Sequence, residues 1–329
     1  ADLAVNGLVE AMAHGRRIWY IYRRLRQALA ERRPALVVLI DFPDFNMFFA
    51  RRVNRLGIPL LWYVSPQVWA WRRYRLRKLA RRVTRMMVVF PFEVPLYEGR
   101  GVAVDFVGHP LVDLARPRLP REETMRKLDL DPARPLVALL PGSRRSELTR
   151  IYPTLIEAAA RMAETRPDIQ FATPVASTLG MEAVAAYTKE GNVRVALGED
   201  LAYDIMAAAD AAAVAAGTAT LECALVGVPM VMVYRLSAVT YLFRPVIDLE
   251  HFCLVNVVAG RPIVPELIQN DCTPERVAEQ TLALLGPEGK KQREAFGEVR
   301  ARLGAGGANV RAANVLLGML DRAGEATAA

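Results

Sequence analysis

Short apolar runs recur along the chain, and a stretch of helical composition follows each of them. The runs cover residues 35–40, 60–64, 85–90, 102–107, 136–140, 170–174, 193–197, 211–215 and 228–234. A short run with little polar alternation is typical of a strand buried on both faces, as in a parallel sheet. Strands that alternate with helices along the chain predict βαβ units. The pattern therefore predicts an α/β fold built from parallel sheets.

The alternation is interrupted at residues 112–135, where four prolines stand among many charged residues. This composition predicts a linker that contains one short helix. Since 329 residues also exceed the usual size of a single core, we expect two doubly wound, Rossmann-like domains. The first comprises residues 1–118 and the second residues 119–329, which end in the helical stretch of residues 274–322.

Composition excludes several classes of protein. With 53% hydrophobic and 24% charged residues, the chain has the composition of a globular protein. It has no uninterrupted apolar run of the roughly 18 to 20 residues that span a membrane, and no signal-peptide pattern. Cys223, Cys253 and Cys272 lack paired spacing, which predicts reduced thiols, and the histidines are too scattered to form a metal site. We expect a cytoplasmic protein without a metal ion or cofactor.

Positive charge is concentrated in the first part of the chain. Residues 1–120 hold 21 Lys and Arg against 9 Asp and Glu, a net charge of +12; residues 121–329 hold 22 against 26, a net charge of −4. The stretch Arg72 to Arg85 has eight basic residues and no acid, and Trp69 and Trp71 precede it. Such a helix suits an anionic membrane surface, and the alternative is a solvated helix whose apolar side is core. Nucleic acid is not expected, because no recognised binding module accompanies the charge.

Two turns in the second domain are candidate phosphate sites. After the run at residues 211–215, Gly217 would let a ligand approach the backbone, and Thr218 would cap a helix with free N–H groups. Glu222 lies four residues beyond Thr218 on the same face, placed to accept hydrogen bonds from a ribose. The alternative is a tight turn with a solvated glutamate.

The other turn follows the run at residues 136–140. Gly142 permits a tight turn, Ser143 can cap the next helix, and Arg144 can pair with a diphosphate. Alternatively this is an ordinary capped turn with a surface arginine. Two anion-binding loops and a ribose acceptor in one domain resemble the nucleotide-sugar half of a GT-B glycosyltransferase.

Carboxylates also follow the first apolar run, at Asp41 and Asp44. Open α/β sheets bind ligands at the carboxyl ends of their strands, so both are candidate catalytic groups. Their alternative role is to cap the following helix. His109, after the run at residues 102–107, is either a substrate contact or a structural histidine.

Seven motifs stand in the order found in the lipid-A-disaccharide synthase family, which the chain resembles over nearly its whole length. They are Asp41-Phe-Pro-Asp-Phe-Asn46, Tyr63-Val-Ser-Pro-Gln-Val-Trp-Ala-Trp71, Phe90-Pro-Phe-Glu93, Gly108-His-Pro-Leu111, Leu140-Pro-Gly-Ser-Arg144, Gly217-Thr-Ala-Thr-Leu-Glu222 and Asn256-Val-Val-Ala-Gly-Arg-Pro-Ile-Val-Pro-Glu-Leu-Ile-Gln269. The resemblance implies two GT-B domains that face a cleft. It implies a hexosyltransferase that transfers the diacylated glucosamine of UDP-2,3-diacylglucosamine to the 6-hydroxyl of 2,3-diacylglucosamine 1-phosphate, with inversion, and releases UDP.

Residue roles follow from that reaction. A base must take the acceptor proton, and Asp44 is preferred over Asp41. Arg144, Gly217, Thr218 and Asn256 would stabilise the diphosphate, Glu222 would hold the ribose, and no cofactor would be needed beyond the UDP-sugar substrate. Acylated substrates imply a peripheral protein on the inner face of the bacterial inner membrane, and a homodimer is also expected. The alternatives are a UDP-sugar epimerase of the same fold and an inactive, membrane-binding fragment.

The chain departs from the family at its start. The family has a Gly-rich loop after its first strand, and nothing like it precedes Ala1-Asp2-Leu3. We therefore expect the sheet of the first domain to be incomplete.

Overall fold

The computed structural model describes residues 15–70, 73–190, 192–235 and 250–328. The described chain forms two compact units. Unit 1 contains the residues up to Pro110 and those from Leu303 on, and unit 2 contains Leu111–Arg235 and Glu250–Arg302. Each unit is built on one parallel sheet, so the predicted α/β fold with two Rossmann-like sheets is confirmed.

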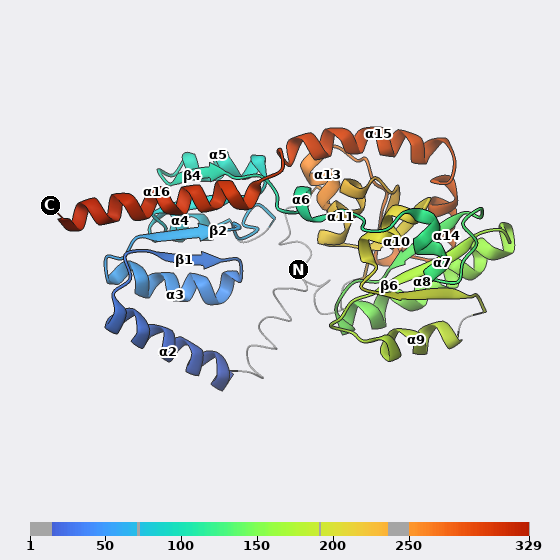
Figure 1. Ribbon diagram of the computed structural model, residues 1–329, viewed down its shortest axis with the longest axis horizontal. Coiled ribbons are helices and arrows are strands. Elements are labelled where there is room, and N and C mark those ends of the chain that lie inside the picture. The colour runs from blue at the N-terminus through green and yellow to red at the C-terminus, as the bar shows by residue number, and fades with distance from the viewer. Residues whose placement is uncertain (1–14, 71–72, 191, 236–249, 329) are drawn as a thin grey trace. The chain divides into compact units, whose positions relative to one another are not determined.

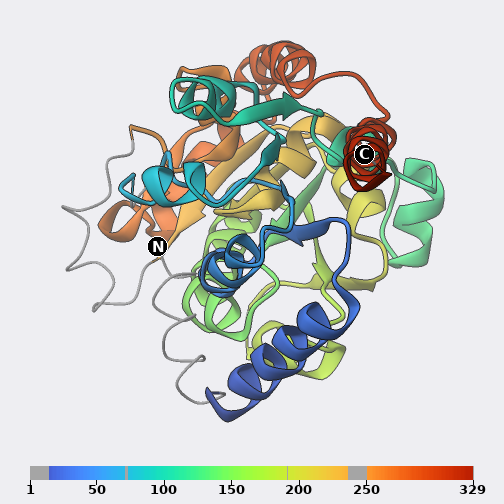
Figure 2. The same cartoon turned by 90° about the vertical axis from the view of Figure 1, so that its left-hand side faces the viewer.

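The four strands of unit 1 coincide with the first four apolar runs. They are β1 (Val37–Ile40), β2 (Leu60–Tyr63), β3 (Arg85–Val88) and β4 (Ala103–Phe106), and they pair in parallel in the order β1-β2-β3-β4. The helices are α2 (Gly15–Arg32), α3 (Pro43–Arg55), α4 (Arg75–Ala80), α5 (Val94–Glu98), which follows the 3-10 turn η1 (Pro91–Glu93), and α16 (Ala308–Ala328). Figure 2 shows α2 and α3 next to each other, with α16 seen end-on.

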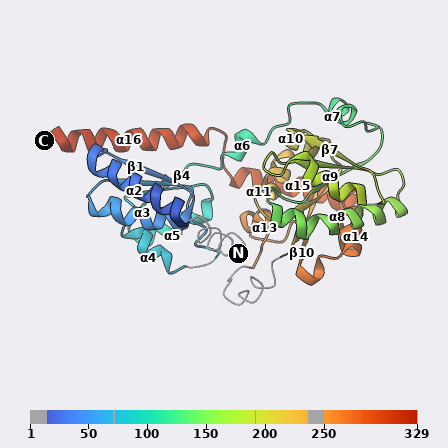
Figure 3. The same cartoon turned by 90° about the horizontal axis from the view of Figure 1, so that it is seen from below.

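Helices cover both faces of this sheet (Figure 3). On one face, residues of α3, α4 and α5 pack with Trp62 and Met86 of the strands. On the other, Ala312 and Met319 of α16 pack on Leu61 and Met87. Burial on both faces explains why the strands read as continuous apolar runs.

Helix α16 belongs to unit 1, whereas the sequence predicted it as the end of the second domain. Gly304 and Gly307 have φ angles of 90° and 87°, which let the chain turn before the helix starts. The guanidinium of Arg311 then donates to the carbonyl oxygens of Val107, Ala305 and Gly306 at 2.7–2.8 Å. The division after Pro110 also differs from the one predicted after residue 118.

Unit 2 holds a six-stranded sheet. Its strands are β5 (Leu136–Leu140), β6 (Gln170–Val175), β7 (Val195–Glu199), β8 (Ala211–Ala215), β9 (Met230–Tyr234) and β10 (Glu266–Ile268), in the order β10-β9-β8-β5-β6-β7. The helices are α6 (Leu111–Leu114), α7 (Arg121–Lys127), α8 (Arg145–Thr165), α9 (Met181–Glu190), α10 (Ala202–Ala208), α11 (Thr218–Val226), α13 (Leu254–Ala259), α14 (Pro274–Ala283) and α15 (Pro287–Arg302), with a 3-10 turn η3 (Gln269–Asp271). Figure 1 shows α8 and α9 on one side of the sheet and α13 and α15 on the other.

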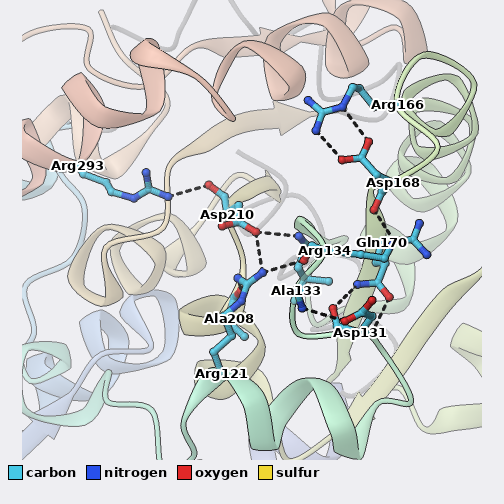
Figure 4. A network of polar contacts seen from close by, with 11 residues as sticks. Arg121, Asp131, Ala133, Arg134, Arg166, Asp168, Gln170, Ala208, Asp210 and Arg293 are labelled. Carbon is cyan, nitrogen blue, oxygen red and sulfur yellow. Dashed lines mark hydrogen bonds and ion pairs between the residues drawn. The ribbon is translucent and has the colours of Figure 1, made fainter.

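A polar network joins the segments that lead into β5, β6 and β8 (Figure 4). The carboxylate of Asp210, just before β8, accepts from the backbone N–H of Leu136 at 2.8 Å and from Arg121 at 3.0 Å. Arg134 donates to the backbone carbonyl of Asp168 at 2.8 Å. These contacts lie at the amino ends of the strands, so they hold the sheet together at the edge opposite to its carboxyl-end loops.

Candidate functional site

The strand order of unit 2 reverses between β5 and β8. From β5 the chain proceeds to β6 and β7 on one side, and β8 to β10 build the other side. In an open parallel sheet, such a switch point opens a crevice at the carboxyl ends of the two strands, where ligands bind. The turns that contain Gly142 and Gly217 directly follow these two strands, and Leu140 pairs with Val214. The fold thus brings both predicted phosphate loops to one edge of the sheet.

The turn between β8 and α11 leaves the helix start open. Gly217 has φ 145° and ψ −160°, a region that only glycine adopts without strain, and Gly217 and Thr218 are exposed. The predicted capping role of Thr218 is wrong: Gly217 is the N-cap and Thr218 is the first helical residue. The N–H of Thr220 bonds to the Gly217 carbonyl at 3.2 Å, whereas no bond within the described part of the chain engages the N–H groups of Thr218 and Ala219. These two N–H groups are therefore available to an anion, as the interpretation of this turn requires.

The turn between β5 and α8 is organised by Glu147. Its carboxylate accepts from the backbone N–H groups of Ser143 and Arg144 at 3.0 and 3.2 Å, and its other oxygen pairs with the Arg144 guanidinium at 3.1 Å. The predicted capping role of Ser143 is therefore wrong, because Arg144 is the N-cap residue and Glu147 reaches back to it. Arg144 is exposed, so its ion pair with Glu147 costs little to exchange for a phosphate. Gly142, at φ 103°, makes room for the Glu147 side chain.

Glu222 lies in the second turn of α11 and is half-buried. The hydroxyl of Tyr203, on α10, lies 3.0 Å from its Oε1 atom. Burial raises the pKa of Glu222, and the Tyr203 hydrogen bond opposes that shift. Sequence reasoning identified Glu222 but not Tyr203, since a tyrosine on another helix leaves no local signal beside the glutamate.

Asn256 is fully buried and holds a loop in place. Its amide nitrogen donates to the carbonyl of Val264 and to Glu266, and its oxygen accepts from the N–H groups of Ile263 and Val264, all at 2.8 Å. Glu266 also accepts from Phe252 and Cys253 at the start of α13. All four bonding positions of the amide are occupied, so a diphosphate contact would require one of these bonds to break.

The two candidate carboxylates of unit 1 have different surroundings. Asp44, in the first turn of α3, forms an ion pair with Arg75 of α4. Asp41 directly follows β1 at φ 45°, its backbone oxygen accepts from the Asn46 amide at 2.7 Å, and its side chain is exposed. Among the described residues, none bonds to the carboxylate of Asp41. Phe42 also has a positive φ, of 41°, so the strand end is strained where a functional site is expected.

Sequence reasoning missed a buried polar cluster beyond β2 and β3. The hydroxyl oxygens of Ser65 and Tyr97 lie 2.6 Å apart, and the Phe90 N–H donates to Glu93 at 3.3 Å. Glu93 is 1% exposed; its burial raises its pKa to about 8, and the bond from the Phe90 N–H is the largest effect that opposes this shift. The signal was present in the motif Phe90-Pro-Phe-Glu93, but no local pattern showed that its carboxyl would be buried.

His109 follows β4 and packs against the Phe90 ring, with centroids 5.2 Å apart. Its backbone N–H donates to the carbonyl of Leu303 at 2.9 Å. Burial lowers the pKa of its side chain to about 4, so the imidazole is neutral at neutral pH. These contacts agree with the structural interpretation of His109.

Part of the basic stretch Arg72 to Arg85 is engaged within unit 1, and Trp71 and Arg72 lie outside the described residues. Helix α4 has only six residues, and its Leu76 and Leu79 are buried in the core. Arg82 donates to the carbonyl of Met47, and Arg85 pairs with Asp105. The exposed basic side chains that remain are those of Arg73, Arg77, Lys78 and Arg81.

Known proteins match this chain closely. The family profile described as lipid-A-disaccharide synthetase matches residues 1–314. The chain belongs to this family. A lipid-A-disaccharide synthase of Geobacter metallireducens is 44% identical over 325 residues, which cover 98% of this chain and 85% of that protein. One of Syntrophus aciditrophicus is 45% identical over 328 residues, with the same coverage. The predicted family, a family of hexosyltransferases, is thereby confirmed.

Solved structures agree on the fold. A UDP-GlcNAc 2-epimerase from Neisseria meningitidis bound to UDP-GlcNAc matches with a TM-score of 0.63 and 13% identity, covering 91% of this chain and 81% of its own. A UDP-forming trehalose-phosphate synthase from Burkholderia xenovorans matches with a TM-score of 0.54 and 13% identity, covering 92% and 78%. At this identity the likeness shows the shared GT-B type of fold. For the epimerase alternative, it supplies a distant structural neighbour only.

Two features are absent from the described residues. None of their helices is both long and apolar enough to cross a membrane. No three of their His, Cys, Asp or Glu side chains are grouped as metal ligands would be. The three cysteines are buried and unpaired, as their spacing predicted.

Proposed function

We propose that this chain forms the β-1,6 disaccharide of lipid A: it transfers the 2,3-diacylglucosamine unit of UDP-2,3-diacylglucosamine to 2,3-diacylglucosamine 1-phosphate and releases UDP. The observation that carries the proposal is the family match over residues 1–314, together with relatives of that name that are 42–45% identical. The switch-point geometry of unit 2 supports it, because the Gly217 turn offers backbone N–H groups to an anion and the adjacent Gly142 turn adds the exposed Arg144 guanidinium.

On the donor side, residues of unit 2 bind the parts of the UDP-sugar. The N–H groups after Gly217 and the guanidinium of Arg144 bind the diphosphate, where negative charge grows as the glycosidic bond to UDP breaks. Glu222 accepts from the ribose hydroxyls. Asn256 acts indirectly, because its four hydrogen bonds fix the loop that precedes β10.

On the acceptor side, the oxygen of the 6-hydroxyl attacks the anomeric carbon, and a carboxylate of unit 1 takes the proton from this hydroxyl. The sequence analysis favoured Asp44 as the base, but the ion pair of Asp44 with Arg75 directs its carboxylate toward α4. We therefore assign the base to Asp41, whose exposed carboxylate follows the strained end of β1. A positioned base of this kind contributes typically about 10²–10⁴-fold to the rate.

The assignment is tested by UDP release from both lipid substrates. We expect Asp41→Asn to lower kcat about 100-fold or more, and Asp44→Asn to lower it much less. Arg144→Ala and Glu222→Gln should each lower kcat/KM by about tenfold or more, since each removes a hydrogen bond to a charged group. Unchanged transfer in Arg144→Ala and Glu222→Gln would refute the nucleotide site. An epimer formed from UDP-N-acetylglucosamine alone would instead favour the epimerase alternative.

We also propose that the protein works at the inner face of the bacterial inner membrane, where its acylated substrates reside. The best surface for this is α2, because α4 has only six residues and buries its Leu76 and Leu79 in the core. Trp19, Tyr20 and Ile21 of α2 are 59%, 56% and 42% exposed. The guanidinium of Arg23 lies over the Trp19 ring at 4.6 Å. Aromatic side chains beside arginines match the interface of an anionic bilayer.

A further inference from the structure

Helices α10 and α11 are joined by a hydrogen bond between two side chains. Tyr203, the second residue of α10, donates its hydroxyl to Oε1 of Glu222 at 3.0 Å. Burial and the neighbouring carboxylate raise the pKa of Tyr203 to about 12, so the phenol keeps its proton and is the donor at neutral pH. Among the described residues, no other group bonds to the Glu222 carboxylate. Its second oxygen, Oε2, is therefore available to a ligand.

The Tyr203 hydroxyl is not required to hold α10 in place. The adjacent Asp204 is 1% exposed and accepts from the backbone N–H groups of Arg118 and Leu119, the latter at 2.9 Å. Ile205 and Met206 of the same helix are buried. These contacts anchor α10 independently of the Tyr203 hydroxyl, so the bond to Glu222 need not be explained by the packing of the helix.

The bond between Tyr203 and Glu222 concerns the orientation of the Glu222 carboxylate. A glutamate carboxylate rotates freely about its last torsion unless a bond fixes it. A single fixed donor at Oε1 sets the plane of the carboxylate, and a fixed acceptor binds a diol better than a rotating one. Thr218 and the exposed turn at Gly217 lie on the same face, one helical turn earlier.

We propose that Tyr203 is a positioning residue that holds Glu222 to read the ribose hydroxyls of the nucleotide. This inference rests on the proposed function, since it assumes that unit 2 binds a uridine nucleotide. It makes Tyr203, through Glu222, a determinant of the preference for ribose over 2′-deoxyribose. If the bond between Tyr203 and Glu222 only linked the two helices, it would stabilise unit 2 but would leave the preference for ribose unchanged.

The test is titration calorimetry of the full chain with UDP and with 2′-deoxy-UDP. The wild-type protein should bind UDP more tightly, and Tyr203→Phe should reduce the ratio of the two Kd values by about tenfold, as expected for a lost hydrogen bond to a charged group. Glu222→Gln should reduce it at least as much, and the double variant should add nothing further. Tyr187→Phe, which removes a hydroxyl from α9, is the matched control and should keep the wild-type ratio.

The outcomes separate the two proposals. If the wild-type protein binds neither nucleotide, the proposed function fails, and this inference fails with it. If it binds UDP with a ribose preference that Tyr203→Phe retains, only the role of Tyr203 is refuted. A preference that is absent from the wild-type protein refutes the role of Tyr203 in the same way. Tyr203→His keeps a donor and should therefore retain part of the ratio that Tyr203→Phe loses.

Discussion

At the scale of single residues, left-handed backbone angles occur directly beyond two strands of unit 1. Asp41 and Phe42 after β1, and Val64 after β2, have φ angles of 45°, 41° and 63°. A left-handed backbone is unfavourable for a branched or bulky side chain and costs on the order of 1–3 kcal/mol at each residue. No sequence pattern predicts these angles, because they depend on the packing of the surrounding chain. They support a functional role for this edge of the sheet.

Glu93 should make the stability of unit 1 depend on pH. Its pKa rises from 4.5 in the unfolded chain to about 8 in the folded protein, chiefly because the carboxyl is buried. The folded state therefore favours the protonated form, and its contribution is present below pH 4.5 and lost as the pH rises through about 8. That contribution is at most about 5 kcal/mol. Glu93→Gln cannot ionise, so the free energy of unfolding should improve relative to the wild-type protein from pH 5 to pH 8.

Urea denaturation of both proteins at pH 5, 6.5 and 8 measures this difference, and groups that titrate alike in both proteins cancel. A difference that stays constant across these pH values would contradict the account. Retained UDP binding by Glu93→Gln would show that the effect is local to unit 1.

At the scale of elements, the sequence predicted the strands well and the helix caps poorly. All nine apolar runs contain strands, because burial on both faces imposes an apolar composition that is visible without any tertiary information. Strand β10 was missed, since its three residues are too few for a pattern and include Glu266. The caps depend on the conformation of individual side chains. Glu147, three residues beyond Arg144, took the role predicted for Ser143.

The carboxylate of Asp210 should contribute measurably to the stability of unit 2. It satisfies the N–H of Leu136 at the start of β5 and binds Arg121 of α7 (Figure 4). Asp210→Ala leaves both groups without this partner, and we expect a loss of about 1–3 kcal/mol in the free energy of unfolding. Asp168→Ala is the control, because it removes only the exposed ion pair with Arg166 and should cause no measurable loss. Equal losses in urea denaturation would refute a special role for Asp210.

At the scale of the whole molecule, the units are not continuous in sequence: the last helix of the chain belongs to unit 1. Periodicity predicted that residues 274–322 are helical, but it could not tell which sheet each helix would cover. Helix α16 packs on β2 and β3, far away in sequence, because Ala312 and Met319 fit the apolar face there. The places of the two candidate phosphate loops were easier to predict, since each loop directly follows a strand and carries its own glycine; that they bind a nucleotide stays a prediction.

The uneven charge of the chain leads to a prediction about membranes. The protein should bind vesicles that contain phosphatidylglycerol and should bind pure phosphatidylcholine vesicles more weakly. Binding should fall as salt increases, because screening acts over about 8 Å at physiological ionic strength. Removing the charge of Arg23 or Arg24 should weaken binding to anionic vesicles by about fivefold each, from roughly 1 kcal/mol per basic residue. Cosedimentation with vesicles measures these changes.

The apolar part of the same surface is tested separately. Trp19→Ser combined with Ile21→Ser should lower binding even at high salt, because it removes the side chains that enter the bilayer interface. Leu317→Ser is the matched control: Leu317 of α16 is 54% exposed, and its replacement should leave binding unchanged. If the control weakens binding as much as the α2 variants, general surface apolarity would explain the result. If neither weakens it while Arg77→Ala and Lys78→Ala do, the membrane surface lies on α4, as the sequence first suggested.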